Sequence, residues 1–239
     1  MHFIAWASHD SYPTTLMKAA FFCLMGLLPA SSARAATIAT PITGTWTGSA
    51  TIPDNNDVGF SSSLSLSLPE ITMVESVSFQ MVINGGWNGD LYAYLIHDGG
   101  FVVLLNRPGR SLANPDGAGS SGMTVDFSDT AAQDIHVALP FGGTPSGSYQ
   151  PDGRATDPLL VLDTDARTSY LSVFNGHSAG GQWTLFLADQ SAGEVSTLQS
   201  WTLSLTVVPE PSGAILMAMS VVVIALSRRR VMVSFPVSS

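Results

Sequence analysis

The sequence predicts an all-β protein, an antiparallel jelly-roll β-sandwich of about eight to ten strands. Three observations favour this fold. Apolar residues alternate with polar ones in several short runs, as they do in half-buried strands. Turn-forming Gly, Pro, Asn and Asp separate those runs. No stretch of ten residues between the two apolar chain ends has a convincing helical period.

Two alternating runs lie back to back within residues 182–207. A period of two places each apolar set on one face of a strand. Residues 189–193 between the runs are turn formers. We therefore expect a pair of core strands whose two tryptophans supply large apolar contact area. The inward-facing sets are Trp183, Leu185 and Leu187, then Leu198, Trp201, Leu203, Leu205 and Val207.

Further strands follow from the same alternation. In residues 62–68 leucine alternates with serine, so Leu64, Leu66 and Leu68 are expected to face inward and the serines to face solvent. Residues 106–122 and 141–158 are rich in Gly, Pro and Ser and are expected to be loops. The other strands are expected at residues 45–52, 74–83, 91–97, 101–105, 123–127 and 169–174.

Charge excludes one class of partner. Residues 36–208 contain four arginines, no lysine and sixteen acidic residues, which gives a net charge of −12. Such a surface repels phosphate backbones, so nucleic acid is not expected to bind. The acidic residues either keep the protein soluble or bind divalent cations. The single cysteine, Cys23, lies outside this region.

The N-terminus has the pattern of a secretory signal peptide, residues 1–35. Met17 and Lys18 begin a short basic region, and an apolar run of about ten residues follows it. Small residues Ala33 and Ala35 precede the expected cut before Ala36, which signal peptidase would make. Met17 is a candidate for the true start of translation.

The C-terminal segment, residues 208–230, combines three elements in order. Val208-Pro209-Glu210-Pro211 ends the last strand, because proline cannot donate to a ladder. Residues 212–227 carry no charge and predict a transmembrane helix of roughly 24 Å, shorter than the ~30 Å hydrocarbon core. Arg228, Arg229 and Arg230 should stay cytoplasmic. A plain membrane anchor is the simple interpretation.

This order of elements also resembles the PEP-CTERM sorting signal of Gram-negative bacteria, with Pro209-Glu210-Pro211 as the recognition tripeptide. The resemblance implies an exosortase-type membrane protease as a partner. It implies export through an inner-membrane intermediate to the cell envelope, the outer surface or the extracellular space. The tail, residues 231–239, is longer than is usual for such signals.

Residues 52–207 are similar to the P domain (homo B domain) that accompanies subtilisin-like proprotein convertases, with residues 36–51 as a lead-in strand. The resemblance implies a jelly-roll sandwich that acts as a non-catalytic companion of a protease. Asn84-Gly85-Gly86 departs from the His-Thr pair of many members. The motifs are IPDN (52–55), SSLSLSL (62–68), NGDL (88–91), LLNRPG (104–109), DFSDTA (126–131), GSYQPDG (147–153), FNG (174–176), WTLFLAD (183–189) and LQSWTLSLT (198–206).

No catalytic motif stands out in this region. The segments that carry the catalytic Ser, His and Asp of a subtilisin-type protease do not occur, so we expect a non-enzyme. His97, His136 and His177 are isolated in the sequence, and zinc is not expected without cysteine. His177 lies in a glycine-rich loop beside Ser178, which leaves a hydrolase open.

Calcium is the candidate cofactor, because acidic and amide side chains cluster in three predicted loops. Asp54, Asn55 and Asp57 form the first cluster, Asp126 and Asp129 the second, and Asp163 and Asp165 the third. The P-domain resemblance adds Asp90 and places Asp54, Asp126 and Asp129 on recurrent acidic positions. The alternative is that Asp and Asn are simply good turn residues.

The predicted role is therefore an exported, non-catalytic β-sandwich of the cell surface or extracellular matrix. Two alternatives stay open. One is a carbohydrate-binding module for extracellular polysaccharide, which would use Trp87, Tyr92, Tyr94 and Tyr149. The other is an accessory domain that acts with a subtilisin-like protease encoded on another chain.

The calcium hypothesis, with one ion joining residues 52–57 to residues 126–129, predicts a thermal effect. A bound ion stabilises the folded state, so the melting temperature should be higher in millimolar calcium than in chelator. Differential scanning calorimetry measures this difference. Identical melting curves under the two conditions would reject calcium binding.

Overall fold

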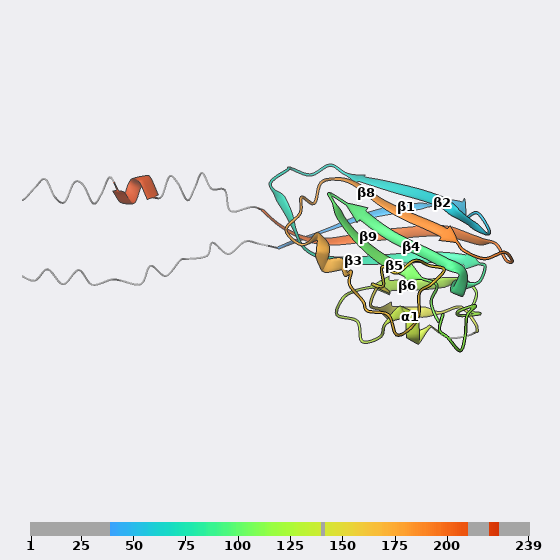
Figure 1. The fold of residues 1–239 in the computed structure, drawn as a ribbon. Coiled ribbons are helices and arrows are strands. Elements are labelled where there is room, and N and C mark those ends of the chain that lie inside the picture. The colour runs from blue at the N-terminus through green and yellow to red at the C-terminus, as the bar shows by residue number, and fades with distance from the viewer. Residues whose placement is uncertain (1–38, 140–141, 210–219, 225–239) are drawn as a thin grey trace, which may run out of the picture. The chain divides into compact units, whose positions relative to one another are not determined.

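The computed structural model describes residues 39–139, 142–209 and 220–224. In this part of the chain nine strands form two sheets, as the prediction of an all-β sandwich required (Figure 1). The first sheet has the order β1-β9-β3-β6-β7 and the second β2-β8-β4-β5. The strands are β1 (Thr40–Thr51), β2 (Asn56–Leu66), β3 (Thr72–Gly85), β4 (Leu91–His97), β5 (Gly100–Asn106), β6 (Met123–Phe127), β7 (Ser146–Tyr149), β8 (Gly181–Asp189) and β9 (Ser196–Pro209).

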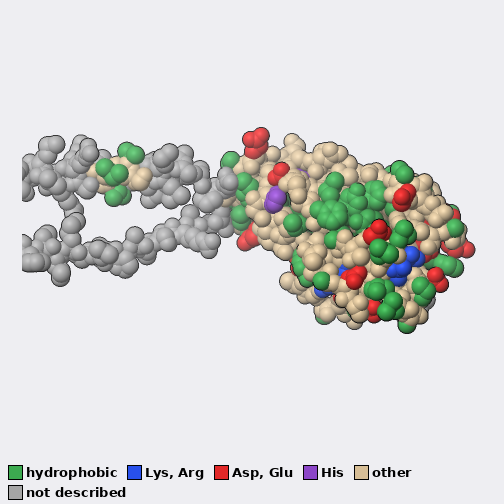
Figure 2. Space-filling view, viewed as in Figure 1, with side chains coloured by type: hydrophobic (Ala, Val, Ile, Leu, Met, Phe, Trp, Pro, Cys, Tyr) green, Lys and Arg blue, Asp and Glu red, His purple; other side chains and the backbone are tan. Residues whose placement is uncertain are grey.

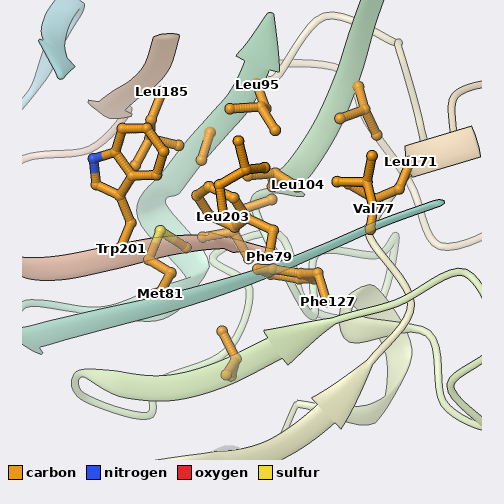
Figure 3. Close-up of a cluster of buried hydrophobic side chains, with 14 of the residues drawn as sticks. Val77, Phe79, Met81, Leu95, Leu104, Phe127, Leu171, Leu185, Trp201 and Leu203 are labelled. Carbon is orange, nitrogen blue, oxygen red and sulfur yellow. The ribbon is translucent and has the colours of Figure 1, made fainter. Parts of the chain in front are cut away.

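The longest pairing joins β3 to β9, which run antiparallel from Thr72 opposite Pro209 to Gly85 opposite Ser196. Alternation on both strands sends one apolar set into the space between the sheets. The rings of Phe79 and Trp201 stack there with centroids 5.5 Å apart. Figure 3 shows the cluster that they form with leucines of the opposite sheet, such as Leu95, Leu104 and Leu185.

Strands β8 and β9 are both core strands, as predicted, but they are not hydrogen-bonded neighbours. β8 pairs with β2 and β4, whereas β9 pairs with β1 and β3 in the other sheet. The chain therefore crosses from one sheet to the other between Asp189 and Ser196. Trp183 and Trp201 are both fully buried between the sheets.

Ser62 is an exception to the prediction that the serines of residues 62–68 face solvent. It is buried on the core face of β2, together with the partly buried Leu64 and Leu66. Its hydroxyl accepts a hydrogen bond of 2.8 Å from Nε1 of Trp201. A buried indole N–H needs such a partner, so the serine makes burial of this tryptophan possible.

Residues 141–158, expected to be loop, contain β7. This strand pairs in parallel with β6, from Thr124 opposite Ser146 to Phe127 opposite Tyr149, so the first sheet is not wholly antiparallel. The prediction missed it because three of its four residues are Ser or Gly and only Tyr149 is buried. A strand of that composition has no apolar alternation to detect.

The strand expected at residues 169–174 is wrong. This segment contains the 3₁₀ helix η2 (Leu171–Phe174), whose two buried side chains are three residues apart, as the period of that helix requires. Two more short helices were not predicted, η1 (Asn88–Asp90) and α1 (Ile135–Ala138). Each is a single turn, which is too short to give a periodic signal.

Register shifts interrupt several strand pairings. The β1–β9 pairing shifts between Thr47 and Ala50, and the β2–β8 pairing shifts between Asn56 and Phe60. The β4–β5 pairing shifts between Ala93 and Tyr94. The central β3–β9 pairing also shifts, between Val74 and Ser76 and between Val82 and Ile83. Irregular pairing therefore occurs both at the edge strands β1, β2 and β5 and inside the first sheet.

Both predicted targeting segments lie largely outside the described residues. These include residues 1–35 with Ala33 and Ala35, the cleavage position Ala36, Glu210, Pro211, the arginines 228–230 and the tail 231–239. Of the predicted transmembrane helix only residues 220–224 are described, and they are helical. Among the described residues no helix has the length and apolar character needed to cross a membrane.

The structure of the core predicts that two tryptophan substitutions differ strongly in their effect on the free energy of unfolding. Trp201→Ala removes a fully buried ring and leaves Ser62 unpartnered, so it should lower the free energy of unfolding by about 3–5 kcal/mol. Trp87→Ala, at a position 47% exposed, should change it by less than about 1 kcal/mol. Urea unfolding followed by far-UV circular dichroism checks both. Equal losses would contradict this description of the core.

Candidate functional site

The first candidate site lies at the end of β8. Asp189 ends this strand and stands in register with Asn56 of β2 and Leu91 of β4. Its side chain is fully buried, and Oδ1 accepts a hydrogen bond of 3.2 Å from the backbone N–H of Ser191. Among the described residues Oδ2 has no hydrogen-bond partner. A buried carboxylate oxygen in this state is energetically costly.

Two further carboxylates, besides burial, raise the pKa of Asp189. Burial raises the pKa of Asp189 to about 6, and the negative charges of Asp90 and Asp54 raise it as well. Asp54, in the β1–β2 turn, accepts a hydrogen bond of 3.1 Å from the backbone N–H of Gly193. The turn between β1 and β2 and the turn between β8 and β9 are therefore held together beside the buried acid.

Asp90 is neutralised by a buried arginine. Nη2 of Arg107 lies 3.4 Å from Oδ1 of Asp90, and both side chains are less than 10% exposed. Nε of Arg107 also donates to the carbonyl oxygen of Gly89 at 3.1 Å. Burial raises the pKa of Asp90, while the charge of Arg107 lowers it. This pair joins the end of β5 to the start of β4, so Asp90 has a structural partner already.

The residues predicted to bind calcium do not come together as one set. Asp54 and Asp90 both lie near Asp189. Asp126, on β6, instead accepts a 2.9 Å hydrogen bond from Nε2 of Gln80, and Asp129 accepts backbone N–H groups of η2 at 2.8 and 2.9 Å.

The strand register shows how far the loop at residues 52–57 lies from Asp126. Ile52 donates to the carbonyl oxygen of Ser196, which stands opposite Gly85, whereas Asp126 stands opposite Gln80. Five residues of strand separate the two positions by about 17 Å. A single ion cannot contact both loops at that distance. In the described part of the chain no three His, Cys, Asp or Glu side chains form a group that could hold a metal ion.

The second candidate site is a buried network around Asp152. Its Oδ2 lies 2.7 Å from Nδ1 of His136, and both side chains are fully buried. Nε2 of His136 lies 2.9 Å from the carbonyl oxygen of Arg110. Burial lowers the pKa of His136, but the hydrogen bond and the charge of Asp152 outweigh it, so the pKa is raised. Both ring nitrogens face acceptors, which suits an imidazolium that donates twice.

The Asp152 network has a structural use. Arg154 contacts Oδ1 of Asp152 at 3.3 Å and Oδ2 of Asp134 at 2.9 Å, and the backbone N–H of Asn106 donates to Asp152 at 3.1 Å. These contacts attach the long irregular segment between β6 and β8 to the end of β5. The network therefore supports the fold rather than presenting a base to solvent.

The other two histidines are also engaged by the backbone. His97 stacks on the ring of Trp183 at 3.9 Å, and its nitrogens lie 2.9 and 2.6 Å from the carbonyl oxygens of Gln182 and Ser178. Nδ1 of His177 lies 2.9 Å from the carbonyl oxygen of Asp98. Within the described residues no hydrogen bond joins the side chains of His177 and Ser178, the pair considered for a hydrolase.

The third candidate site is an open groove of about 640 Å³ on the outer face of the second sheet. Its floor consists of Tyr92 and Tyr94 of β4 and Phe186 of β8. In Figure 2 a broad apolar area lies over these two strands. The polar rim includes Asn55, Asn56, Asp57, Asp157 and Gln190.

Sequence reasoning found part of this groove. Tyr92 and Tyr94, two of the aromatic residues that a carbohydrate-binding module is expected to use, both line it. Tyr149 is buried at 7% exposure, and Trp87 does not line the groove. Phe186 was missed, although its parity, opposite to that of the inward-facing Leu185 and Leu187, signals an outward aromatic ring.

The buried acid predicts a pH-dependent effect of Asp189→Asn. A folded-state pKa of about 6 against an ordinary 3.8 means that Asp189 supports the fold below about pH 3.8 and loses that contribution as pH rises through 6. A neutral asparagine should therefore raise the free energy of unfolding at pH 7.5, by at most about 3 kcal/mol. The gain should shrink towards pH 4.

Urea unfolding in chelator measures this effect, because chelator prevents a metal ion from stabilising the charged acid. The control is Asp163→Asn, at an exposed position, which should change stability little at either pH. The same stability difference for Asp189→Asn at both pH values would contradict the raised pKa.

Comparison with known proteins leaves the family of this chain open. No family model and no curated protein matches the sequence. The crystal structure of the Aeromonas sobria serine protease with its chaperone (ORF2) is similar over 72% of this chain, with 16% identity and a TM-score of 0.41. The structure of the serine protease of Aeromonas sobria is similar over 71%, with 14% identity and a TM-score of 0.38. This chain covers 27% of each of those chains.

Proposed function

We propose that this chain is an exported, non-catalytic β-sandwich that acts by binding at the cell surface or in the extracellular matrix. One observation carries the proposal. Strand β9 ends at Pro209, the first residue of the Pro-Glu-Pro tripeptide. All nine described strands therefore precede Glu210, so a cut on the C-terminal side of Pro209 would leave every one of them in place.

The buried polar groups already have hydrogen-bond partners within the protein, which supports a binding role rather than a catalytic one. His97, His136 and Asp152 all make short contacts to neighbouring protein groups. A catalytic base needs a free nitrogen or oxygen within reach of a substrate. The groove over β4 and β8, in contrast, presents polar side chains to solvent beside apolar ones, as ligand sites commonly do.

The route that we propose begins with signal peptidase, which cuts before Ala36. The helix at residues 212–227 then holds the chain in the inner membrane until an exosortase-type protease acts at Pro209-Glu210-Pro211. The similarity of residues 52–207 to P domains makes a separate subtilisin-like protease the protein partner to test, by co-purification of the exported form.

The sorting proposal predicts that replacing Pro209, Glu210 and Pro211 by alanine blocks release. The altered chain should accumulate in the inner membrane with its C-terminus intact, because the protease no longer recognises it. Cell fractionation followed by intact-mass measurement checks this.

The same chain offers a matched control. Pro69 and Glu70 form a second Pro-Glu pair, exposed between β2 and β3. Replacing these two residues by alanine should leave release unchanged. Normal release of the variant altered at Pro209, Glu210 and Pro211 would overturn the sorting proposal.

A further inference from the structure

The outer face of the second sheet carries aromatic rings that the core does not need. Tyr92 and Tyr94 alternate on β4 with the buried Leu91, Ala93 and Leu95, so they point away from the core. Polar residues usually occupy such solvent-facing positions in a sandwich. Their place on this face therefore calls for an explanation outside folding.

The rings form one connected cluster. Tyr94 and Phe186 are partners in register on β4 and β8, and their rings stack at 4.6 Å with an interplanar angle of 14°. The ring of Tyr92 lies 5.8 Å from that of Tyr94 and is turned by 62°. Phe101 of β5 extends the cluster, 5.1 Å from Tyr94. The cluster thus offers rings in more than one orientation.

An irregularity in β2 places the polar rim beside these rings. Gly59 has a φ of +60°, and a Cβ there would lie 2.6 Å from the ring of Phe186 and 2.3 Å from the carbonyl oxygen of Leu187. Only glycine lets β2 approach so closely. Asn56 stabilises the bend, because its Oδ1 accepts the backbone N–H of Val58 at 2.9 Å. Asn55 from the turn before β2, and Asn56 and Asp57 at the start of the strand, line the groove with these rings.

The polar atoms around the cluster are largely unused by the protein. Within the described residues no hydrogen bond engages the side chains of Asn55, Asp57 or Gln190, or the hydroxyls of Tyr92 and Tyr94. Burial, with the nearby Tyr94, Asp152 and Asp157, raises the pKa of Tyr92 to about 12, so its hydroxyl stays protonated. Amides and hydroxyls can both donate and accept hydrogen bonds, whereas the carboxylates accept.

We propose that this groove binds a neutral polysaccharide chain, which deepens the proposed binding function by naming the class of ligand. Apolar C–H faces of sugar rings would contact Tyr92, Tyr94 and Phe186, and sugar hydroxyls would bond to the amides and carboxylates of the rim. The lining contains no lysine or arginine, and its acids Asp57 and Asp157 repel anions. Acidic polysaccharides are therefore excluded. The groove is open to solvent, so an internal section of a chain can enter it.

Isothermal titration calorimetry on the purified full chain tests the proposal. The probes are cellohexaose, xylohexaose and mannohexaose as neutral chains, hexagalacturonate as an acidic chain and tetramethylammonium as a cation. At least one neutral chain should bind, and more tightly than hexagalacturonate or tetramethylammonium. Binding to none of the neutral chains, or tighter binding of either charged probe, overturns the proposal.

Three variants locate the site. Phe186→Ala removes a ring of the floor and should weaken binding of the neutral chain at least tenfold. Tyr92→Phe keeps the ring but removes the free hydroxyl, so it should weaken binding severalfold with an unchanged melting temperature. Tyr170→Ala removes an exposed ring that packs on Arg167, outside the groove, and should bind like the unaltered chain.

The outcomes separate this inference from the sorting proposal. If Phe186→Ala and Tyr92→Phe, both folded by circular dichroism, bind the neutral chain as tightly as Tyr170→Ala does, the groove is not the site. That result leaves release through Pro209-Glu210-Pro211 untouched. Failed sorting, conversely, leaves the affinity of the purified chain for sugar unchanged.

Discussion

The crossing of the chain between β8 and β9 is the constraint on which the rest of the fold depends. Two strands that are adjacent in sequence enter opposite sheets, and each occupies a position between two partners. Trp183 and Trp201 are thereby buried in the same core, and the bond from Trp201 to Ser62 reaches across it. The described part of the chain contains no cysteine, so burial between the sheets must hold them together.

The segment between β6 and β8 is held by different forces. It has little regular structure, and Figure 1 shows it gathered beside β5 and β6. Asp152 fixes it through contacts to His136, Arg154 and the backbone of Asn106. Because each charge in this network has a partner of opposite charge or a hydrogen bond, its burial is tolerated. Apolar packing therefore holds the two sheets together, and buried polar contacts hold much of the segment between β6 and β8.

Much of the strand content could be predicted from the sequence, because alternation reports which face of a strand is buried. It worked for residues 74–83 and 182–207, where large apolar residues alternate over most of each strand, as in residues 77–83, 183–187 and 201–207. It failed for β7, which has three small or polar residues, and for η2, where the spacing of Leu171 and Phe174 belongs to a helix. Single-turn helices gave no signal at all.

The candidate sites were harder to predict, because pairing between distant segments creates them. Asp54 and Asp189 are neighbours only through the register of β2 with β8, and no local pattern reveals that. The parity of Tyr92, Tyr94 and Phe186, opposite to that of the buried residues beside them, could have indicated outward rings, but Phe186 was missed. It could not show that β4 and β8 are adjacent strands with those rings in contact.

The interrupted pairings at the sheet edges have a consequence for copies of this chain that fold close to one another. A long, regular edge strand is a template on which another copy can add a strand, and that is a route to aggregation. Here β1, β2 and β5 each carry a register shift, and the fourth edge, β7, is only four residues long. Copies that fold side by side therefore meet edges that are poor templates, and each sandwich closes on its own strands.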